Sequence, residues 1–244
     1  MDDIIYLSIL IFAAGLLYSS VGHAGASGYL AAMALFGLAP EVMKPTALTL
    51  NILVATIATF QFYRAGFFSL DKFWPFAVSS VPFAFIGGAM SLPGNIYKQI
   101  VGLVLLFTAY HFYRQRQTAI VNVSRPVPVH LAIISGAGIG LLSGTVGVGG
   151  GIFLTPLILL MGWAGTKQTA AVSAAFILMN SIAGLAGHLT SERSLPSEIY
   201  FWAFAAMLGG IIGSFLGSRR LTNTTLYSLL AVVLVIAGVK FILV

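Results

Sequence analysis

Two glycine-rich interruptions divide long apolar stretches of this chain, and they constrain its fold more than any other feature. The first falls within residues 21–28 and the second within residues 146–151, where three glycines follow one another. Glycine weakens a helix because it loses the most backbone freedom on ordering. Broken backbone is tolerated at membrane depth only where protein or a water-filled cavity surrounds it. Each interruption therefore predicts a helix break buried inside a helical bundle.

The composition is that of a membrane protein. Of the 244 residues, 59% are hydrophobic and 7% are charged, and the mean hydropathy is +1.00. Such values are typical of polytopic membrane proteins. The net charge of +6 does not indicate nucleic-acid binding, because the basic residues stand in short connections between apolar runs. The chain has no cysteine, which excludes disulfides and thiolate metal sites, and we predict no cofactor and no metal site.

The apolar segments predict an all-α fold with ten helical segments. They cover residues 4–20, 27–38, 45–63, 71–92, 96–113, 129–146, 151–162, 168–188, 198–218 and 223–243. Segments 27–38 and 151–162 hold only 12 residues each, well short of the ~20 that a straight crossing needs. We therefore predict that each is a short helix following a break. The sequence leaves open whether these helices cross the membrane or re-enter it.

An internal repeat relates the two halves of the chain. Positions around the first break recur around the second at one constant spacing. The matched positions are Gly15, Leu16, Leu17, Val21, Gly22 and Gly25 with Gly140, Leu141, Leu142, Val146, Gly147 and Gly150. Duplication accounts for this match better than chance does. We predict two repeats of about five helical segments, over residues 1–113 and 129–244, joined by a cytoplasmic linker over 114–128. An odd number of crossings in each half requires that the two repeats have inverted topology.

The distribution of basic residues indicates the orientation. With the linker in the cytoplasm, eight basic residues lie inside and four lie outside. Those inside are Arg64, Lys72, Arg114, Arg116, Arg125, Lys167, Arg219 and Arg220, and those outside are Lys44, Lys98, Arg193 and Lys240. Basic residues favour the cytoplasmic side. We therefore predict a multi-pass protein of the bacterial inner membrane with both termini in the periplasm.

These features resemble the sulfite exporter TauE/SafE family, also called the toluene-sulfonate uptake permeases. The resemblance covers nearly the whole chain and rests on the two breaks, the repeat and the stretches 143–151 and 169–175. Residues 23–27 depart from it, because a more glycine-rich run is usual at that place in the family. The resemblance implies secondary transport of small sulfur-containing anions, such as sulfite and sulfonates, or of related organic acids.

An anion inside a bilayer needs oriented donors or positive charge around it. The starts of segments 27–38 and 151–162 would present unpaired backbone N–H groups and the positive ends of two helix dipoles. Inverted symmetry would aim both at one point near the midplane, where inverted-repeat carriers bind substrate. The candidate residues at these starts are Gly25, Ala26, Ser27, Thr145, Gly149, Gly150 and Gly151. The alternative is that the glycines only allow close helix packing, as we expect for Gly209, Gly213 and Gly217.

Polar side chains near the breaks extend the candidate site. A protonated His23 would balance the charge of an anion and titrate where a proton-coupled carrier operates. The alternative is a neutral histidine bonded to a nearby carbonyl. Asn51 and Asn180 lie deep in the third and eighth segments, with Thr49 and Ser173 near them on the same segments. The two amides either donate to substrate oxygens or form interhelical hydrogen bonds.

We predict a secondary transporter that works by alternating access, one bundle rocking against the other. Its partners would be the lipid bilayer, a small anion and a coupled proton, with no nucleic acid, and it would be a monomer or a homodimer. One alternative is a passive channel for anions or other solutes. Another is a rhomboid-like intramembrane serine protease, because residues 25–28 match G-x-S-G and His188 would serve as the base. A four-residue match is weak, so we predict that the chain is not an enzyme.

Overall fold

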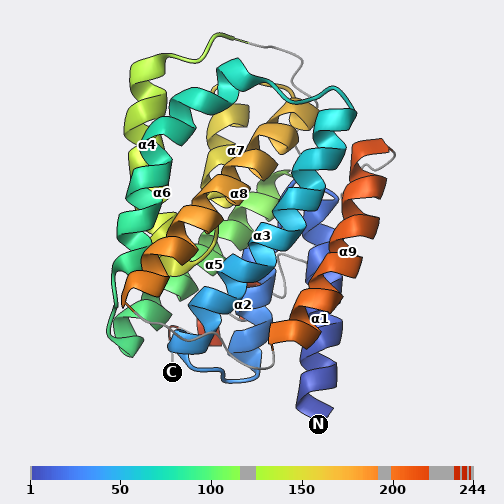
Figure 1. Ribbon diagram of the computed structural model, residues 1–244, viewed down its shortest axis with the longest axis vertical. Coiled ribbons are helices and arrows are strands. Elements are labelled where there is room, and N and C mark those ends of the chain that lie inside the picture. The colour runs from blue at the N-terminus through green and yellow to red at the C-terminus, as the bar shows by residue number, and fades with distance from the viewer. Residues whose placement is uncertain are drawn as a thin grey trace.

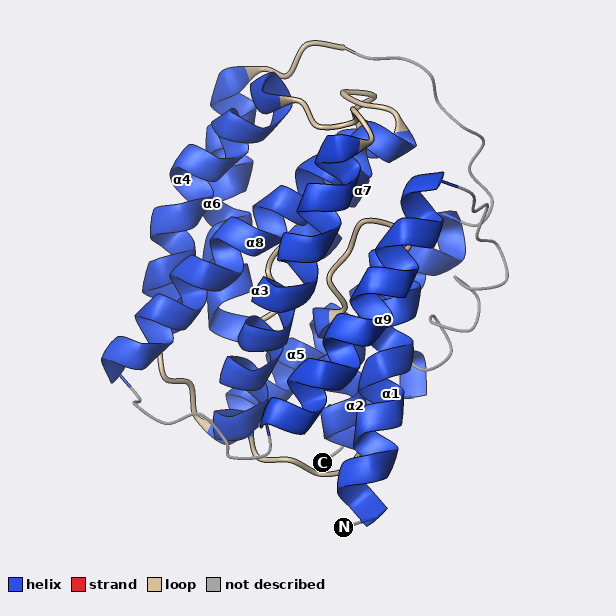
Figure 2. Ribbon diagram, turned by 45° about the vertical axis from the view of Figure 1, so that its right-hand side comes forward, coloured by secondary structure: helices blue, strands red, loops and turns tan. Residues whose placement is uncertain are grey.

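The computed structural model describes residues 2–115, 125–191, 199–219, 234–236, 238–240 and 242. Within these ranges every regular element is a helix (Figure 2). Most of the tenth predicted segment, 223–243, lies outside the described residues. So do residues 116–124 of the predicted linker and the basic residues Arg116, Arg193 and Arg220.

The described helices confirm the first nine predicted segments. The first half holds α1 (Asp2–Ser19), α2 (Ala26–Leu35), α3 (Pro40–Arg64), α4 (Leu70–Ala89) and α5 (Gly94–Gln115). The second half holds α6 (Val129–Val146), α7 (Gly151–Leu160), α8 (Thr166–Ser191) and α9 (Ile199–Arg219). The largest difference at a helix start is in α3, which begins at Pro40 and not at residue 45. Proline suits the first turn of a helix because its missing N–H is not needed there.

The surface is that of a membrane protein. Among the described helices, α3, α6, α8 and α9 are long and apolar enough to cross a bilayer. Large apolar side chains point outward along them, and Ile134 is 70% exposed and Tyr200 79% exposed. Leu160, at the end of the short helix α7, is 77% exposed. An apolar exterior of this kind is stable in contact with lipid tails and not with water.

The helices α2 and α7 are too short to cross the hydrocarbon core. Each has 10 residues, which corresponds to about 15 Å against a core of about 30 Å. Figures 1 and 2 show α2 toward the end of the molecule where both chain termini lie, and α7 toward the opposite end. The backbone N–H of Arg125, before α6, donates to the carbonyl of Gly162, after α7, at 2.9 Å. The α6–α7 pair therefore leaves and returns to the same end of the molecule.

Two glycine seams bring helices of different halves together. Glycines of α9 face backbone carbonyls of α1 and of the residue that follows it, in the pairs Gly209 with Phe12, Gly213 with Leu16 and Gly217 with Ser20. Glycines of α6 face α4 in the same way, in the pairs Gly136 with Phe76, Gly140 with Ser80 and Gly144 with Ala84. The predicted packing role of Gly209, Gly213 and Gly217 is thus confirmed. Between the seams, α3 packs against α8 and α9, and α8 packs also against α4 (Figure 1).

Candidate functional site

The first break connects α1 to α2 and is closed largely by its own aromatic residues. Gly25 precedes α2 with φ +104°, and no side chain caps the helix start. The Tyr29 hydroxyl donates to the carbonyl of Ala24 at 2.7 Å. The Tyr18 hydroxyl interacts with the hydroxyl of Ser27. Tyrosines of the adjoining helices therefore bond some of the polar groups of this break.

The second break connects α6 to α7 and requires glycine at several positions. Gly147, Gly149 and Gly150 have φ values of +91°, +72° and +82°. This left-handed region disfavours residues with a Cβ atom. Gly150 is the N-cap residue of α7 and has no side chain to bond the N–H groups of the first turn. The start of α7 is therefore held in place by backbone conformation and not by a capping side chain.

Three buried donors from α3 and α8 surround the second break. A Cβ atom on Gly149 would lie 2.9 Å from Ser181 Oγ and 3.0 Å from Asn51 Nδ2, and one on Gly150 would lie 3.2 Å from Asn180 Nδ2. Asn51, Asn180 and Ser181 are fully buried. Ser181 was not among the residues predicted from the sequence, although it adjoins Asn180.

Most of the hydrogen-bonding atoms of these three side chains have no partner among the described residues. Asn180 Oδ1 accepts a hydrogen bond from Ser80 Oγ at 2.8 Å. Among the residues that the structure describes, both amide atoms of Asn51, Nδ2 of Asn180 and Oγ of Ser181 have no hydrogen-bond partner. A buried donor without a partner costs about 1–3 kcal/mol. These side chains are therefore able to bond an acceptor that reaches them.

A small cavity joins the two breaks. Its lining comprises Tyr18, His23, Ala24, Gly25, Ala26 and Ser27 from the first half, with Val148, Ile152 and Ile177 from the second. The His23 side chain interacts with the backbone of Gly151, the first residue of α7. The start of α2 thus lies beside the start of α7, and one wall of the cavity between them is apolar.

Three hydroxyl residues predicted for the site bond elsewhere. Thr49 Oγ1 donates to the Pro45 carbonyl at 2.9 Å, and Thr145 Oγ1 donates to the Leu141 carbonyl at 2.8 Å. Ser173 Oγ lies 2.8 Å from Thr155 Oγ1 and links α8 to α7. None of the three lines the cavity between the breaks. The two threonines bond within their own helices because a threonine hydroxyl on a helix bonds readily to the carbonyl four residues earlier.

The histidines divide between the interior and the surface. His130 is exposed at the start of α6. His111, near the end of α5, is half-buried and close enough to His23 for an electrostatic interaction. It is partly covered because α5 packs against α2, α3 and α6.

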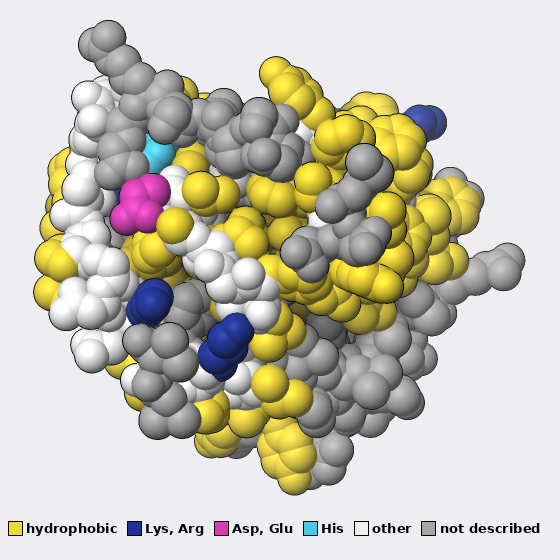
Figure 3. Space-filling model, turned by 90° about the horizontal axis from the view of Figure 1, so that it is seen from below, with side chains coloured by type: hydrophobic (Ala, Val, Ile, Leu, Met, Phe, Trp, Pro, Cys, Tyr) yellow, Lys and Arg dark blue, Asp and Glu magenta, His cyan; other side chains and the backbone are white. Residues whose placement is uncertain are grey.

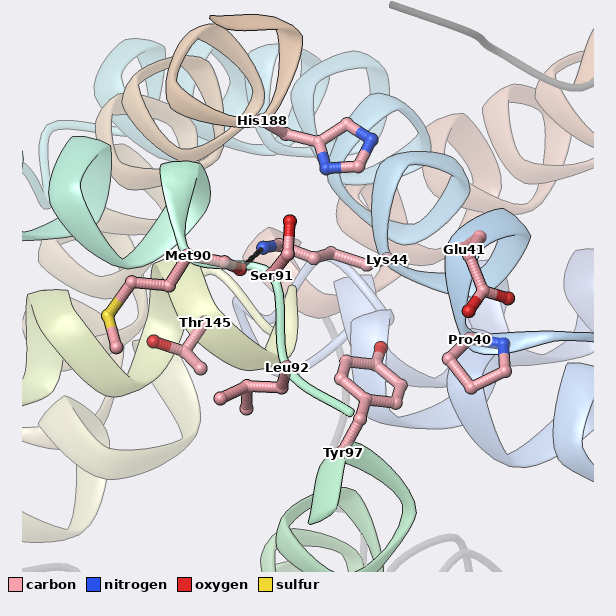
Figure 4. Close-up of a pocket in the computed structure, with 9 residues that line it drawn as sticks. All are labelled: Pro40, Glu41, Lys44, Met90, Ser91, Leu92, Tyr97, Thr145 and His188. Carbon is pink, nitrogen blue, oxygen red and sulfur yellow. Dashed lines mark hydrogen bonds between the residues drawn. The ribbon is translucent and has the colours of Figure 1, made fainter. Parts of the chain in front are cut away.

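A second pocket opens where α3 begins and α4 ends (Figure 4). Its lining comprises Pro40, Glu41, Lys44, Met90, Ser91, Leu92, Tyr97, Thr145 and His188. Lys44 was predicted in a connection outside the membrane, but it lies on α3 and is only 6% exposed. The proline at the start of α3 is the signal that would have placed it on the helix. We call this space the Lys44 pocket.

Comparison with known proteins assigns the family. A sequence profile described as "Sulfite exporter TauE/SafE" matches residues 7–241. The chain belongs to the TauE/SafE family. This TauE/SafE protein is 42% identical over 241 residues to the "Probable membrane transporter protein y4hK" of Sinorhizobium fredii, with 98% of each chain covered. It is 27% identical over 198 residues to the "Probable membrane transporter protein MJ0441" of Methanocaldococcus jannaschii, with 76% of this chain and 72% of that protein covered. No solved structure matches the chain.

The family is one of membrane transporters and not of enzymes, and the geometry agrees. Ser27 lines the cavity between the breaks, whereas His188 lines the Lys44 pocket. A serine nucleophile needs its histidine base within hydrogen-bonding reach. The two residues of the protease alternative therefore lie in different pockets.

Proposed function

We propose that this TauE/SafE protein is a secondary transporter that carries small sulfur-containing anions, such as sulfite or sulfonates, or related organic acids across the inner membrane. The substrate binds between the starts of α2 and α7. One observation supports this most strongly. Buried donors of Asn51, Asn180 and Ser181 with no partner among the described residues surround Gly149 and Gly150, next to the cavity shared with the first break.

The electrostatics of this place favour an anion. Both short helices direct N-termini without capping side chains toward the region of the breaks. A helix N-terminus has a partial positive charge and offers backbone N–H groups. The residues that line the cavity include no acidic side chain. Because the glycines of the second break have no Cβ atom, an oxyanion can approach the backbone closely.

The reciprocal packing of the halves supports inverted repeats and alternating access. The first helix of each half packs along the fourth helix of the other, α1 with α9 and α6 with α4. The two short helices lie at opposite ends of the molecule (Figure 1). Rocking of one bundle against the other would then open the site to each side in turn.

The described basic residues support a cytoplasmic position for the end that holds α7. Lys72 Nζ donates to the carbonyl of Trp163, which follows α7. The ammonium of Lys167 lies 5.0 Å from the ring of Phe67, which follows α3. Because basic residues concentrate on the cytoplasmic side, this orientation leaves both termini in the periplasm.

Uptake by purified protein in proteoliposomes tests the proposal. The panel contains sulfite, sulfate, methanesulfonate and acetate, each with and without an imposed pH gradient, and protein-free vesicles are the control. We expect saturable uptake of at least one of these anions that is accelerated by the same anion inside the vesicles. Such acceleration identifies a carrier, whereas uptake that does not saturate identifies a channel. Absence of uptake for the whole panel contradicts the proposed function.

A further inference from the structure

We propose that the Lys44 pocket is an entrance site that attracts small oxyanions and leads them to the second break. This inference deepens the proposed function and rests on it. It concerns residues outside the cavity between the breaks, and it assigns the attracting charge to Lys44.

Lys44 places a fixed positive charge in the pocket. Among the residues that the structure describes, no other lysine, arginine, aspartate or glutamate is buried. Its Nζ donates to the carbonyls of Gly87 at 3.4 Å, Gly88 at 2.8 Å and Met90 at 3.0 Å, at the end of α4. Figure 4 shows the bond to Met90. A cation is stabilised there by the negative end of the helix dipole. The side chain is therefore held in one position, in surroundings that screen its charge less than bulk water does.

The inner wall of the pocket is formed by the second break and its neighbours. Thr145, in the last turn of α6, lines the pocket. Tyr97 lines it too, and its hydroxyl donates to the Val146 carbonyl at 3.0 Å. A Cβ atom on Gly147 would lie 3.2 Å from the carbonyl oxygen of Lys44. An anion in the pocket would therefore stand next to the break that Asn51 also adjoins.

The mouth of the pocket has the opposite charge. Glu41 is exposed and lies one turn before Lys44 on α3, and His188 is buried on the facing helix α8. Figure 3 views the molecule from this end and shows an acidic side chain beside a histidine. The carboxylate repels an incoming anion at the mouth and the ammonium attracts it further in. The two groups therefore predict opposite effects when each is neutralised.

Because the chain has no cysteine, a single introduced thiol can report the charge in the pocket. Ser91→Cys, at an exposed position in the lining, would be reacted with an anionic and a cationic methanethiosulfonate of similar size, in vesicles at low ionic strength. The measured quantity is the ratio of the anionic to the cationic reaction rate. We expect Lys44→Gln to lower this ratio about tenfold and Glu41→Gln to raise it severalfold, because a unit charge nearby acts oppositely on the two reagents. We also expect millimolar sulfate to slow the anionic reaction with Lys44 present and not after Lys44→Gln.

Lys240→Gln is the matched control. The Nζ of Lys240 donates to the carbonyl of Leu35 at 3.0 Å, so this lysine also lies at a helix end, but it does not line the pocket. Its substitution should leave the ratio within about twofold, because a charge outside the pocket acts on the reagents through solvent of high dielectric constant.

An unchanged ratio in both Lys44→Gln and Glu41→Gln would overturn the inference. Because Lys44 bonds the end of α4, its substitution can prevent folding, and the exposed position Glu41 then decides the test. Reaction rates at Ser91→Cys do not require turnover. An unchanged ratio together with normal uptake therefore refutes only the entrance site, whereas a ratio that responds without any uptake refutes only the proposed function.

Discussion

The two breaks share a backbone design but differ in what surrounds them. The first is covered by Tyr18 and Tyr29, which bond to the break and to the start of α2. The second is surrounded by donors of α3 and α8 that have no partner within the described part of the protein. Both breaks thus have glycine turns and a short helix, while the buried amide and hydroxyl donors of Asn51, Asn180 and Ser181 gather at the second. We infer that the second break contributes more to substrate binding than the first.

Adding a methyl group at the second break should have the largest effect. Gly149→Ala places a Cβ atom 2.7 Å from Ile177 Cγ2 and 3.0 Å from Asn51 Nδ2, at a φ of +72°. We expect uptake to fall about a hundredfold, because the methyl group fills the space beside the donors and strains the backbone by about 1–2 kcal/mol. Initial rates in proteoliposomes measure the loss.

Gly162→Ala separates strain from blockage in that test. Gly162 has a similar φ of +65°, and a Cβ atom there would meet nothing within 4 Å. If Gly162→Ala abolishes uptake as fully as Gly149→Ala does, backbone strain and not occlusion of a site explains both results.

The two asparagines should separate binding from stability. Asn51→Leu removes an amide without a partner among the described residues, so we expect little change in thermal stability and a tenfold or greater rise in KM, from loss of a hydrogen bond to a charged ligand. Asn180→Leu takes the acceptor away from Ser80 Oγ and should cost about 1–3 kcal/mol of stability. Thermal unfolding in detergent and uptake kinetics on the same samples give both quantities. A loss of stability in Asn51→Leu equal to that in Asn180→Leu, with unchanged KM, would assign Asn51 to packing.

Removing the imidazole tests the contribution of the first break. We expect His23→Ala to reduce uptake about tenfold, the lower end of the range for one charge-assisted contact, and to flatten its dependence on pH between about 5 and 8. His130→Ala, at an exposed position on α6, is the control and should leave the pH profile unchanged. If the profile of His23→Ala matches that of the unmodified protein, the histidine has no part in coupling.

The smallest effect on uptake is expected from removing a hydrogen bond within the first break. Tyr29→Phe removes the hydrogen bond to the Ala24 carbonyl and should cost about 1 kcal/mol of stability, with uptake within about twofold. Thermal unfolding and uptake assays detect both changes. A loss of transport as large as that of Asn51→Leu would reverse the ranking of the two breaks.

Local patterns predicted most of the secondary structure and the positions of the breaks. Apolar runs identify helices in a membrane protein, and consecutive glycines mark where a helix cannot continue, as at Gly149 and Gly150. The candidate site was predicted less completely. Asn51, Gly149, Gly150 and Asn180 lie together, but Thr49 and Ser173 bond to their neighbours, and Ser181 was not predicted. A hydroxyl that faces a ligand and one that bonds its own helix look alike in a sequence.

The amino-acid sequence by itself determined the membrane environment, the helical segments and the two breaks, because hydropathy and glycine content act over a few residues. Only the tertiary structure decided that Asn51 of α3 meets Gly149, and that Lys44 is buried against the end of α4. Such contacts join residues far apart in the chain, so they depend on how α3, α4 and α8 pack around the breaks. Packing of this kind depends on the shapes of whole helices, so it cannot be predicted from a short stretch of sequence.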